Sequence, residues 1–269
     1  MIYYIEEPVG SFQNSCMRLN LQSYGTGFPL IILHGLFGSL DNWQTISRKL
    51  AEHFQIFAID QRNHGGSPHS DDFNYQVMAE DLFEVMESNG LTKAHLLGHS
   101  MGGKTAMQFA LSYPGKVEKL IVADIAPKAY PPWHIPIFEA LLSLELTQYR
   151  SRKQIDDALA VSIPETALRQ FLLKNLATNP DGTYRWKIDL QSIYRNYSRL
   201  NAPVSGVGTF TGPVLFIKGE QSDYILDSDA NLIRHCFPKA QFRTIPNAAH
   251  WLHAEKPIEF IKIVEEFLL

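Results

Sequence analysis

The amino-acid sequence predicts an α/β protein in which helices cover both faces of a mostly parallel central sheet. Short apolar runs of strand length alternate with amphipathic segments of helical length along most of the 269 residues. Strands that are apolar throughout and alternate with helices are typical of parallel sheets buried on both sides. Hydrophobic residues make up 45% of the chain and charged residues 19%, which indicates a globular protein with a sizeable core.

Six apolar runs predict the main strands, at residues 29–35, 55–60, 94–98, 119–126, 213–219 and 241–246. The segment 2–24 is more polar but still β-like. We therefore expect it to supply an antiparallel strand at the edge of the sheet.

Apolar residues at helical spacing predict helices at 41–54, 74–90, 105–114, 228–237 and 257–269. Asp41 is the expected N-cap of the first helix, and Gly90 is expected to end the second. Pro114 stops the third, and Pro257 occupies the first position of the last helix, where proline is tolerated.

One long stretch interrupts this alternation of strands and helices. Residues 127–205 contain the segment AYPPWHIP and several helical pieces but no clear strand. We therefore expect a helical cap at 127–205, inserted into a core formed by residues 1–126 and 206–269. The chain length suits one large domain with an insertion better than two full domains.

Composition and charge exclude several classes of function. The net charge of −4 gives no indication of nucleic-acid binding. Cys16 and Cys236 lie far apart and outside any Cys/His cluster, so we expect no metal site, no cofactor and two reduced thiols. No signal-peptide pattern and no apolar run near the roughly 18 residues of a membrane span is present, so we expect a cytoplasmic protein. The sequence predicts no particular oligomeric state.

A glycine-flanked serine lies between a predicted strand and a predicted helix. The segment Gly98-His-Ser-Met-Gly102 is a Gly-x-Ser-x-Gly motif in the context that a nucleophile elbow requires. The turn strains the serine backbone, and the two glycines remove side chains that would clash there. Ser100 at a helix N-terminus also favours developing negative charge. We therefore predict Ser100 as a nucleophile.

A serine nucleophile needs a base and donors for an oxyanion. Among ten histidines, His250 follows the last strand and precedes the last helix, where the base of such a fold is expected; His253 is the near rival. The loop LHGLFGS follows a central strand and can direct a backbone N–H at the oxyanion. We expect the N–H groups of Leu36 and Met101 as the donors, with Phe37 as the alternative to Leu36.

Five segments resemble the α/β-hydrolases, and more narrowly the bacterial YbfF-type esterases: HGLFGSLDNW, DQRNHGGSP, LLGHSMGGK, VADIAP and AHWLHAEKP. They are spread over residues 34–257, and RNHG and DIAP are the motifs that narrow the resemblance. The resemblance implies an α/β-hydrolase fold with the cap after strand six in the family's numbering. It also implies activity on short to medium acyl esters and acyl-CoA thioesters.

The acid that orients His250 has two candidates. In most α/β-hydrolases it follows strand seven, about three residues after a glycine. Here Gly219 is followed by Ser222 in that register, and Asp223 is one residue late. The YbfF-type resemblance implies instead Asp124 of the DIAP segment, with Ser222 as a possible helper through a hydrogen bond. An aspartate that closes an apolar strand needs a partner such as a histidine ring. We favour Asp124 and keep Asp223 as the alternative.

Two further segments carry charge. Asp60, Arg62 and His64 lie in the loop DQRNHGGS after a predicted strand, where an Arg–Asp pair that holds the turn is favoured over contact with the substrate. Residues 127–203 of the predicted cap hold ten lysines and arginines against seven acidic residues, together with many aromatics. The simpler interpretation is solvated charges and aromatic packing; the alternative is an apolar acyl slot with a basic rim for an anionic leaving group.

Together these residues predict a serine hydrolase that cleaves carboxylic esters, and acyl-CoA thioesters as a further class, through an acyl-enzyme on Ser100. A carbon–carbon bond hydrolase or lyase on the same triad is an alternative enzyme. A small-molecule receptor or signalling protein is the non-enzyme alternative, since a fold does not determine a function.

Overall fold

A seven-stranded sheet forms the centre of the computed structural model, which describes residues 17–205 and 208–269. Its strand order is β1-β3-β2-β4-β5-β8-β9. The strands are β1 (Leu21–Tyr24), β2 (Phe28–Leu33), β3 (Phe54–Ile59), β4 (Ala94–His99), β5 (Val117–Ala123), β8 (Val214–Gly219) and β9 (Ala240–Ile245). Only β1 is antiparallel to its neighbour, which confirms the predicted mostly parallel sheet. The rest of the expected edge segment, up to residue 16, lies outside the described residues.

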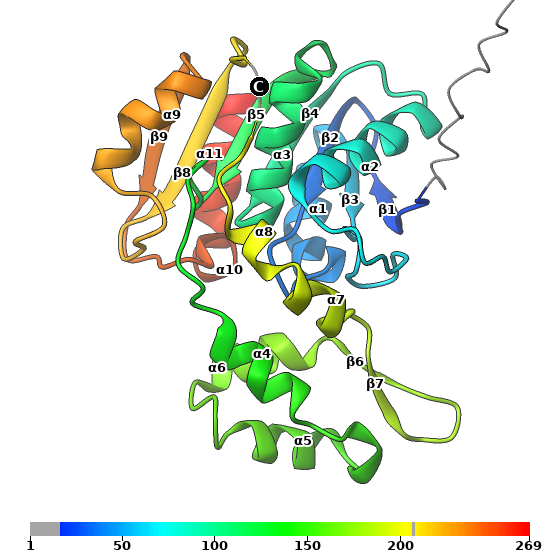
Figure 1. The fold of residues 1–269 in the computed structure, drawn as a ribbon. Coiled ribbons are helices and arrows are strands. Elements are labelled where there is room, and N and C mark those ends of the chain that lie inside the picture. The colour runs from blue at the N-terminus through cyan, green and yellow to red at the C-terminus, as the bar shows by residue number, and fades with distance from the viewer. Residues whose placement is uncertain (1–16, 206–207) are drawn as a thin grey trace, which may run out of the picture.

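Helices cover both faces of this sheet, as Figure 1 shows. One face packs against α2 (Tyr75–Ser88), α3 (Met101–Ser112) and α9 (Ala230–Cys236), and the other against α1 (Gln44–Leu50) and α11 (Pro257–Leu268). Side chains of a strand alternate between faces. Thus Ile31 and Leu33 are buried in the core against α2, α3 and α9, and Leu30 and Ile32 are buried in the core against α1 and α11. Burial on both faces explains why these strands are continuously apolar.

The helix boundaries follow their end signals with two differences. Asn74 caps α2, accepting from the backbone N–H groups of Gln76 and Val77 at 3.0 and 3.1 Å. Asp41 is not the N-cap of α1: it lies in a short 3₁₀ turn, Leu40–Trp43, which precedes the helix. The helix α3 begins at Met101, four residues before the expected start, because the two weak helix formers Gly102 and Gly103 hide its first turn in the sequence.

Between β5 and β8 the chain forms a separate layer, seen at the bottom of Figure 1. We call residues 127–205 the cap. It contains α4 (Ile135–Leu142), α5 (Arg152–Leu159), α6 (Thr166–Leu173), α7 (Leu190–Arg195), α8 (Tyr197–Asn201) and a hairpin of β6 (Leu176–Thr178) and β7 (Tyr184–Trp186). The hairpin corrects the expectation of no strand: three-residue strands are too short to show an alternating pattern. The strand β5 is strand six in the family's numbering, and the domain boundaries at 126/127 and 205/206 stay predictions.

The cap has its own hydrophobic core, which extends into the sheet domain. Cap side chains such as Phe138 and Leu172 are buried in it together with Phe37, Met78 and Met101 of the sheet domain. Phe37 lies 4.9 Å from Phe138, measured between ring centroids. Aromatic residues of the cap thus pack against the loop and the helix that flank Ser100.

Other short elements complete the described chain. They are 3₁₀ turns at Pro114–Lys116, Leu146–Gln148 and Asp227–Asp229, and the one-turn helix α10 (Leu252–Glu255). Cys236 is half-buried with a free thiol, and Cys16 lies outside the described residues. No helix in the described part of the chain has the length and apolar character that crossing a membrane requires. In the same ranges no group of three or more His, Cys, Asp or Glu could hold a metal ion.

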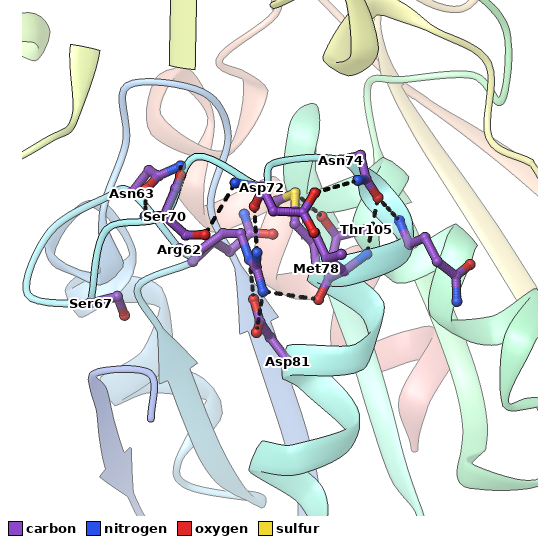
Figure 2. A network of polar contacts seen from close by, with 12 residues as sticks. Arg62, Asn63, Ser67, Ser70, Asp72, Asn74, Met78, Asp81 and Thr105 are labelled. Carbon is purple, nitrogen blue, oxygen red and sulfur yellow. Dashed lines mark hydrogen bonds and ion pairs between the residues drawn. The ribbon is translucent and has the colours of Figure 1, made fainter. Parts of the chain in front are cut away.

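A buried ion pair fixes the loop after β3 to α2 (Figure 2). The guanidinium of Arg62 donates to both carboxylate oxygens of Asp81, at 2.6 and 2.7 Å, and also to the backbone carbonyl of Asp72. Its expected partner Asp60 accepts instead from the backbone N–H groups of Leu40 and Gly66, at 2.7 and 2.8 Å. The expected pair of Arg62 with Asp60 is therefore wrong: Arg62 pairs with Asp81, and Asp60 binds backbone N–H groups instead. The sequence alone could not indicate this, because the packing of α2 brings Asp81 to Arg62.

Removing the charge of Asp81 tests how much this anchor stabilises the fold. Asp81→Asn leaves the guanidinium of Arg62 buried without a counterion, and breaking a buried pair in this way costs about 3–5 kcal/mol. We expect the free energy of unfolding in urea to fall by about 3 kcal/mol. In the control, Glu87→Gln removes the surface pair with Lys116 and should change it by about 0.5 kcal/mol or less. Equal effects of the two variants would contradict an anchoring role for Arg62 and Asp81.

Candidate active site

Ser100 lies at the junction of β4 and α3 in a strained backbone conformation, with φ of 51° and ψ of −117°. Neighbouring backbone leaves no room for side chains on either side of it. A Cβ on Gly98 would lie 2.2 Å from the carbonyl oxygen of Gly102, and one on Gly102 would lie 2.4 Å from that of Leu33. The glycines of the motif are thus required sterically, and they let the strained turn present Ser100 above the sheet edge.

His250 and Asp124 form a hydrogen-bonded chain with Ser100. The Ser100 hydroxyl lies 3.0 Å from His250 Nε2, and His250 Nδ1 lies 2.8 Å from Asp124 Oδ2. A carboxylate can only accept, so the imidazole donates from Nδ1 and leaves Nε2 free to accept the serine proton. The three side chains come from loops after β4, β5 and β9, whose carboxyl ends share one edge of the sheet.

Asp124 is fully buried at the end of β5, with φ of 52°. Its Oδ1 accepts from the backbone N–H of Gly219 at 3.1 Å, and its Oδ2 also accepts from the Ser222 hydroxyl. Ser222 therefore occupies the register of the commoner acid and donates to Asp124. Within the described residues Asp223 forms no hydrogen bond or ion pair with His250. The structure thus brings Asp124, and not Asp223, to the histidine, and it brings Ser222 to Asp124.

Burial controls the protonation of this pair. Loss of hydration lowers the pKa of His250 well below its ordinary value of 6.5, because the charged imidazolium is disfavoured. Burial has the larger effect on Asp124 and raises its pKa to about 7, while the hydrogen bonds from Ser222 and Gly219 oppose this rise. Together with His250 Nδ1, three donors converge on the Asp124 carboxyl group and favour its ionised form. Because burial lowers its own pKa, the His250 imidazole is neutral and able to accept a proton.

The two backbone N–H groups expected as oxyanion donors belong to Met101, directly after Ser100, and to Leu36, which lines the same cavities as Ser100. The N–H of Met101 is the first of α3 and has no partner within the helix. For the N–H of Leu36 the described structure contains no acceptor. The N–H of Phe37 donates instead to His64 Nε2 at 3.3 Å. Of the two loop residues considered, Leu36 is the one whose N–H is free.

Other histidines support this arrangement. His99 Nε2 lies 2.8 Å from the backbone carbonyl of His250, to which it donates. The ring of His34 forms two hydrogen bonds: its Nδ1 lies 2.8 Å from the carbonyl oxygen of Gly35, and its Nε2 accepts from the backbone N–H of Gln61 at 3.0 Å. His253, the near rival, stacks on Trp43 with 4.4 Å between ring centroids, and in the described structure it is His250 that contacts the Ser100 hydroxyl.

Sequence reasoning missed Tyr224. Its ring stacks on the His250 imidazole, with 3.8 Å between centroids and 13° between ring planes. A stacked aromatic ring fixes the plane of the imidazole between Ser100 and Asp124. The only available signal was its position two residues after Ser222, which carries no information about stacking.

Two cavities meet at Ser100. The larger, of about 280 Å³, is lined by His250, by the Leu36 loop and by the apolar cap side chains Ile137, Leu168 and Phe171. The narrow one, of about 40 Å³, extends along α3 beneath the start of the cap. No lysine or arginine of the cap lines either cavity. The cap side of the larger cavity is thus apolar, and no cap cation forms the basic rim of the alternative interpretation at either cavity.

Known proteins are similar to this chain in sequence and in fold. A family model described as alpha/beta hydrolase fold matches residues 29–257. The sn-1-specific diacylglycerol lipase ABHD11 of Mus musculus is 38% identical over 261 residues, which cover 94% of this chain and 85% of that protein. Esterase YbfF of Escherichia coli K12 is 32% identical over 258 residues, covering 94% and 99%. A solved structure of a marine microorganism esterase is 48% identical with a TM-score of 0.92, covering 94% of this chain and 100% of that one.

The two candidate acids can be separated by charge-neutral substitutions. Asp124→Asn removes the carboxylate that fixes the tautomer of His250, and such a loss can lower kcat by up to roughly 10⁴-fold. We expect a loss approaching that size for an activated ester, with the fold retained by circular dichroism. Asp223→Asn is the matched variant and should stay within about threefold of the wild type. A large loss in Asp223→Asn with an active Asp124→Asn would reverse the assignment.

The pH dependence of kcat/KM reports the base in the free enzyme. A base must be neutral to accept a proton, so activity falls as pH drops through its pKa. Because burial lowers the pKa of His250, we expect kcat/KM for an uncharged ester to stay level from about pH 8 to about pH 6.5 and to fall only below the ordinary histidine value. Ellipticity measured at each pH controls for unfolding. A midpoint above 6.5 would show that the charged imidazolium is stabilised instead.

Proposed function

The chain belongs to the alpha/beta hydrolase fold family and is an esterase or lipase, and from that premise we propose that it hydrolyses carboxylic esters with short to medium acyl groups through an acyl-enzyme on Ser100. The observation that carries the proposal is the hydrogen-bonded chain from Ser100 through His250 to a buried Asp124. A serine hydroxyl becomes a competent nucleophile when a positioned base accepts its proton.

The first half-reaction forms the acyl-enzyme. Ser100 Oγ attacks the ester carbonyl carbon while His250 Nε2 accepts the hydroxyl proton, and the Asp124 carboxylate stabilises the resulting imidazolium. The imidazolium then gives this proton to the leaving alkoxide, and the carbon–oxygen bond to the alcohol breaks. The neutral imidazole at the start and the 3.0 Å contact with the serine oxygen support this sequence of proton transfers.

The tetrahedral intermediate carries a negative oxygen that needs donors. We assign this role to the backbone N–H groups of Leu36 and Met101, and the engagement of Phe37 with His64 supports Leu36 over Phe37. Fixed donors of this kind stabilise the developing charge without reorganisation, and removing one such donor typically lowers kcat by about 10²–10³-fold.

The second half-reaction releases the acid. A water molecule takes the place of the departed alcohol, and His250 Nε2 accepts one of its protons as the water oxygen attacks the acyl carbon. The bond between the acyl carbon and Ser100 Oγ then breaks, and the imidazolium returns a proton to the serine oxygen. The products are a carboxylic acid and the regenerated hydroxyl.

The chemistry of the walls bears on the substrate. The larger cavity beside His250 is lined mainly by apolar and aromatic groups, which supports uncharged ester portions of modest size. Acyl-CoA thioesters are the second class that we propose, on the excess of positive charge in the cap. Four of the ten cap cations form ion pairs with acidic residues: Lys128, Lys153, Arg169 and Arg195. The other six are available to phosphates. The uncharged walls favour simple esters over thioesters of coenzyme A.

Replacing the nucleophile tests the proposal. Ser100→Ala should lower kcat for p-nitrophenyl butyrate by at least about 10³-fold with the fold intact, because no other group can form the acyl-enzyme. A fluorophosphonate probe should label Ser100 in the wild type and leave Ser100→Ala unlabelled. Ser143→Ala, at an exposed cap serine, is the matched control and should behave as the wild type. Labelling at another residue would rule out Ser100 as the nucleophile.

The same assay with matched acyl chains separates the two substrate classes. The kcat/KM values of p-nitrophenyl esters and acyl-CoAs of equal chain length are measured at low and high salt. Contacts between cap cations and coenzyme A phosphates would make kcat/KM fall with salt for the thioester alone. Equal salt responses would leave the cap charges as solvated surface and would contradict the binding of coenzyme A phosphates by the cap.

A further inference from the structure

Lys104 is a buried lysine one helical turn after Ser100. Its backbone N–H donates to the carbonyl oxygen of Ser100 at 3.0 Å, within α3. The residue is 1% exposed. Residues four apart lie on the same face of a helix, and both line the narrow cavity of about 40 Å³. The fold therefore places a deeply buried amine in a cavity that opens onto the nucleophile.

No carboxylate of the described chain forms an ion pair with this amine. Lys104 Nζ donates to the backbone carbonyl of Ala202 at 2.7 Å, and a second carbonyl, of Asn201, lies at 3.5 Å. The rings of Tyr75 and Tyr130 lie 5.5 and 4.9 Å from Nζ, measured to their centroids. An ammonium group has three donors, and lysine is almost never fully buried unless it is paired. The short bond to Ala202 and the long one to Asn201 leave at least one of the three donors without an acceptor in the described structure.

The two cavities differ in which reacting group they contain. His250 lines the larger cavity and must give its proton to the leaving oxygen, so the alcohol portion of the ester belongs there. The narrow cavity is lined by Met101, one of the assigned oxyanion donors, and by Lys104, but not by His250. The acyl portion, on the other side of the carbonyl carbon, is then directed along α3 toward Lys104.

We propose that the narrow cavity binds the acyl group and that Lys104 recognises a carboxylate at its far end, so that half-esters of short dicarboxylic acids are preferred substrates. This inference rests on the proposed function. The cavity volume corresponds to about three water molecules, which suits an acyl group of only a few atoms. The apolar and aromatic walls around Lys104 strengthen its attraction for an anion, because little water screens it.

The electrostatics around Lys104 agree with this assignment. Burial is the cause that lowers the pKa of Lys104, to about 7, since no acidic side chain compensates the lost hydration. A carboxylate bound beside the amine would restore its charge and supply acceptors for its unused donors. A purely structural lysine that ties α3 to the end of the cap would need only the bond to Ala202 that is already present.

The test compares two ethyl esters of nearly equal shape. Monoethyl succinate carries a carboxylate where ethyl 4-methylpentanoate carries an uncharged isopropyl group of similar shape. For the wild type we expect the ratio of their kcat/KM values to favour the half-ester by roughly tenfold or more, the size of one charge-assisted hydrogen bond. In Lys104→Met this ratio should fall to about one or below, because a buried carboxylate then lacks a partner. Lys104→Gln provides a second variant that keeps a donor.

A lysine far from the cavity gives the matched control. Lys262→Met removes an exposed amine on α11 and should leave the substrate ratio at the wild-type value. A wild-type ratio near one would overturn the proposal whether or not the Lys104 variants fold. An unchanged ratio in Lys104→Met with a lower melting temperature would show that Lys104 only tethers the cap.

Failure of this inference can be distinguished from failure of the proposed function. Hydrolysis of ethyl 4-methylpentanoate that depends on Ser100, without a preference for the half-ester, would contradict the role of Lys104 alone. Absence of turnover of both esters together with absence of fluorophosphonate labelling at Ser100 would contradict the esterase mechanism itself.

Discussion

The close approach of β4, α3 and β2 around Ser100 is the constraint on which the rest of the site depends. Backbone atoms of Gly102 and Leu33 occupy the places where side chains at positions 98 and 102 would lie. This crowding holds Ser100 at positive φ and places the first N–H of α3 beside its hydroxyl. A relaxed turn would lose the direction of the nucleophile and one oxyanion donor together, because both depend on the same few backbone angles.

The order of the strands explains how three distant segments meet at this turn. In the sheet β4 is next to β5, β5 to β8 and β8 to β9, so the loops after them are neighbours at one edge. Asp124 after β5 can therefore accept from Gly219 at the end of β8 and also reach His250 after β9. The acid that orients His250 can follow either β5 or β8 in the chain, because the ends of both strands lie beside this histidine. Ser222 after β8 then serves as a donor to the Asp124 carboxylate.

Burial supplies the electrostatic setting of this edge. The cap closes over it with apolar side chains that join the core around Phe37 and Met101. Exclusion of water keeps the His250 imidazole neutral and strengthens each hydrogen bond to Asp124. The same exclusion of water makes the buried positive charge of Lys104 unfavourable unless an anion lies beside it. A substrate that supplies a carboxylate to the narrow cavity would provide that anion.

The sequence by itself determined the features that have local signals. Apolar runs of strand length predict the sheet, glycine spacing identifies the turn at Ser100, and the position after the last strand identifies His250. Only the tertiary structure decided which groups meet across the chain: Asp124 rather than Asp223 at the histidine, Tyr224 on its ring, and Asp81 rather than Asp60 beside Arg62. The hairpin in the cap was also hidden, since its strands are only three residues long. A periodic pattern records which face of an element is buried, whereas the partner of a buried polar group is set by contacts between residues far apart in sequence.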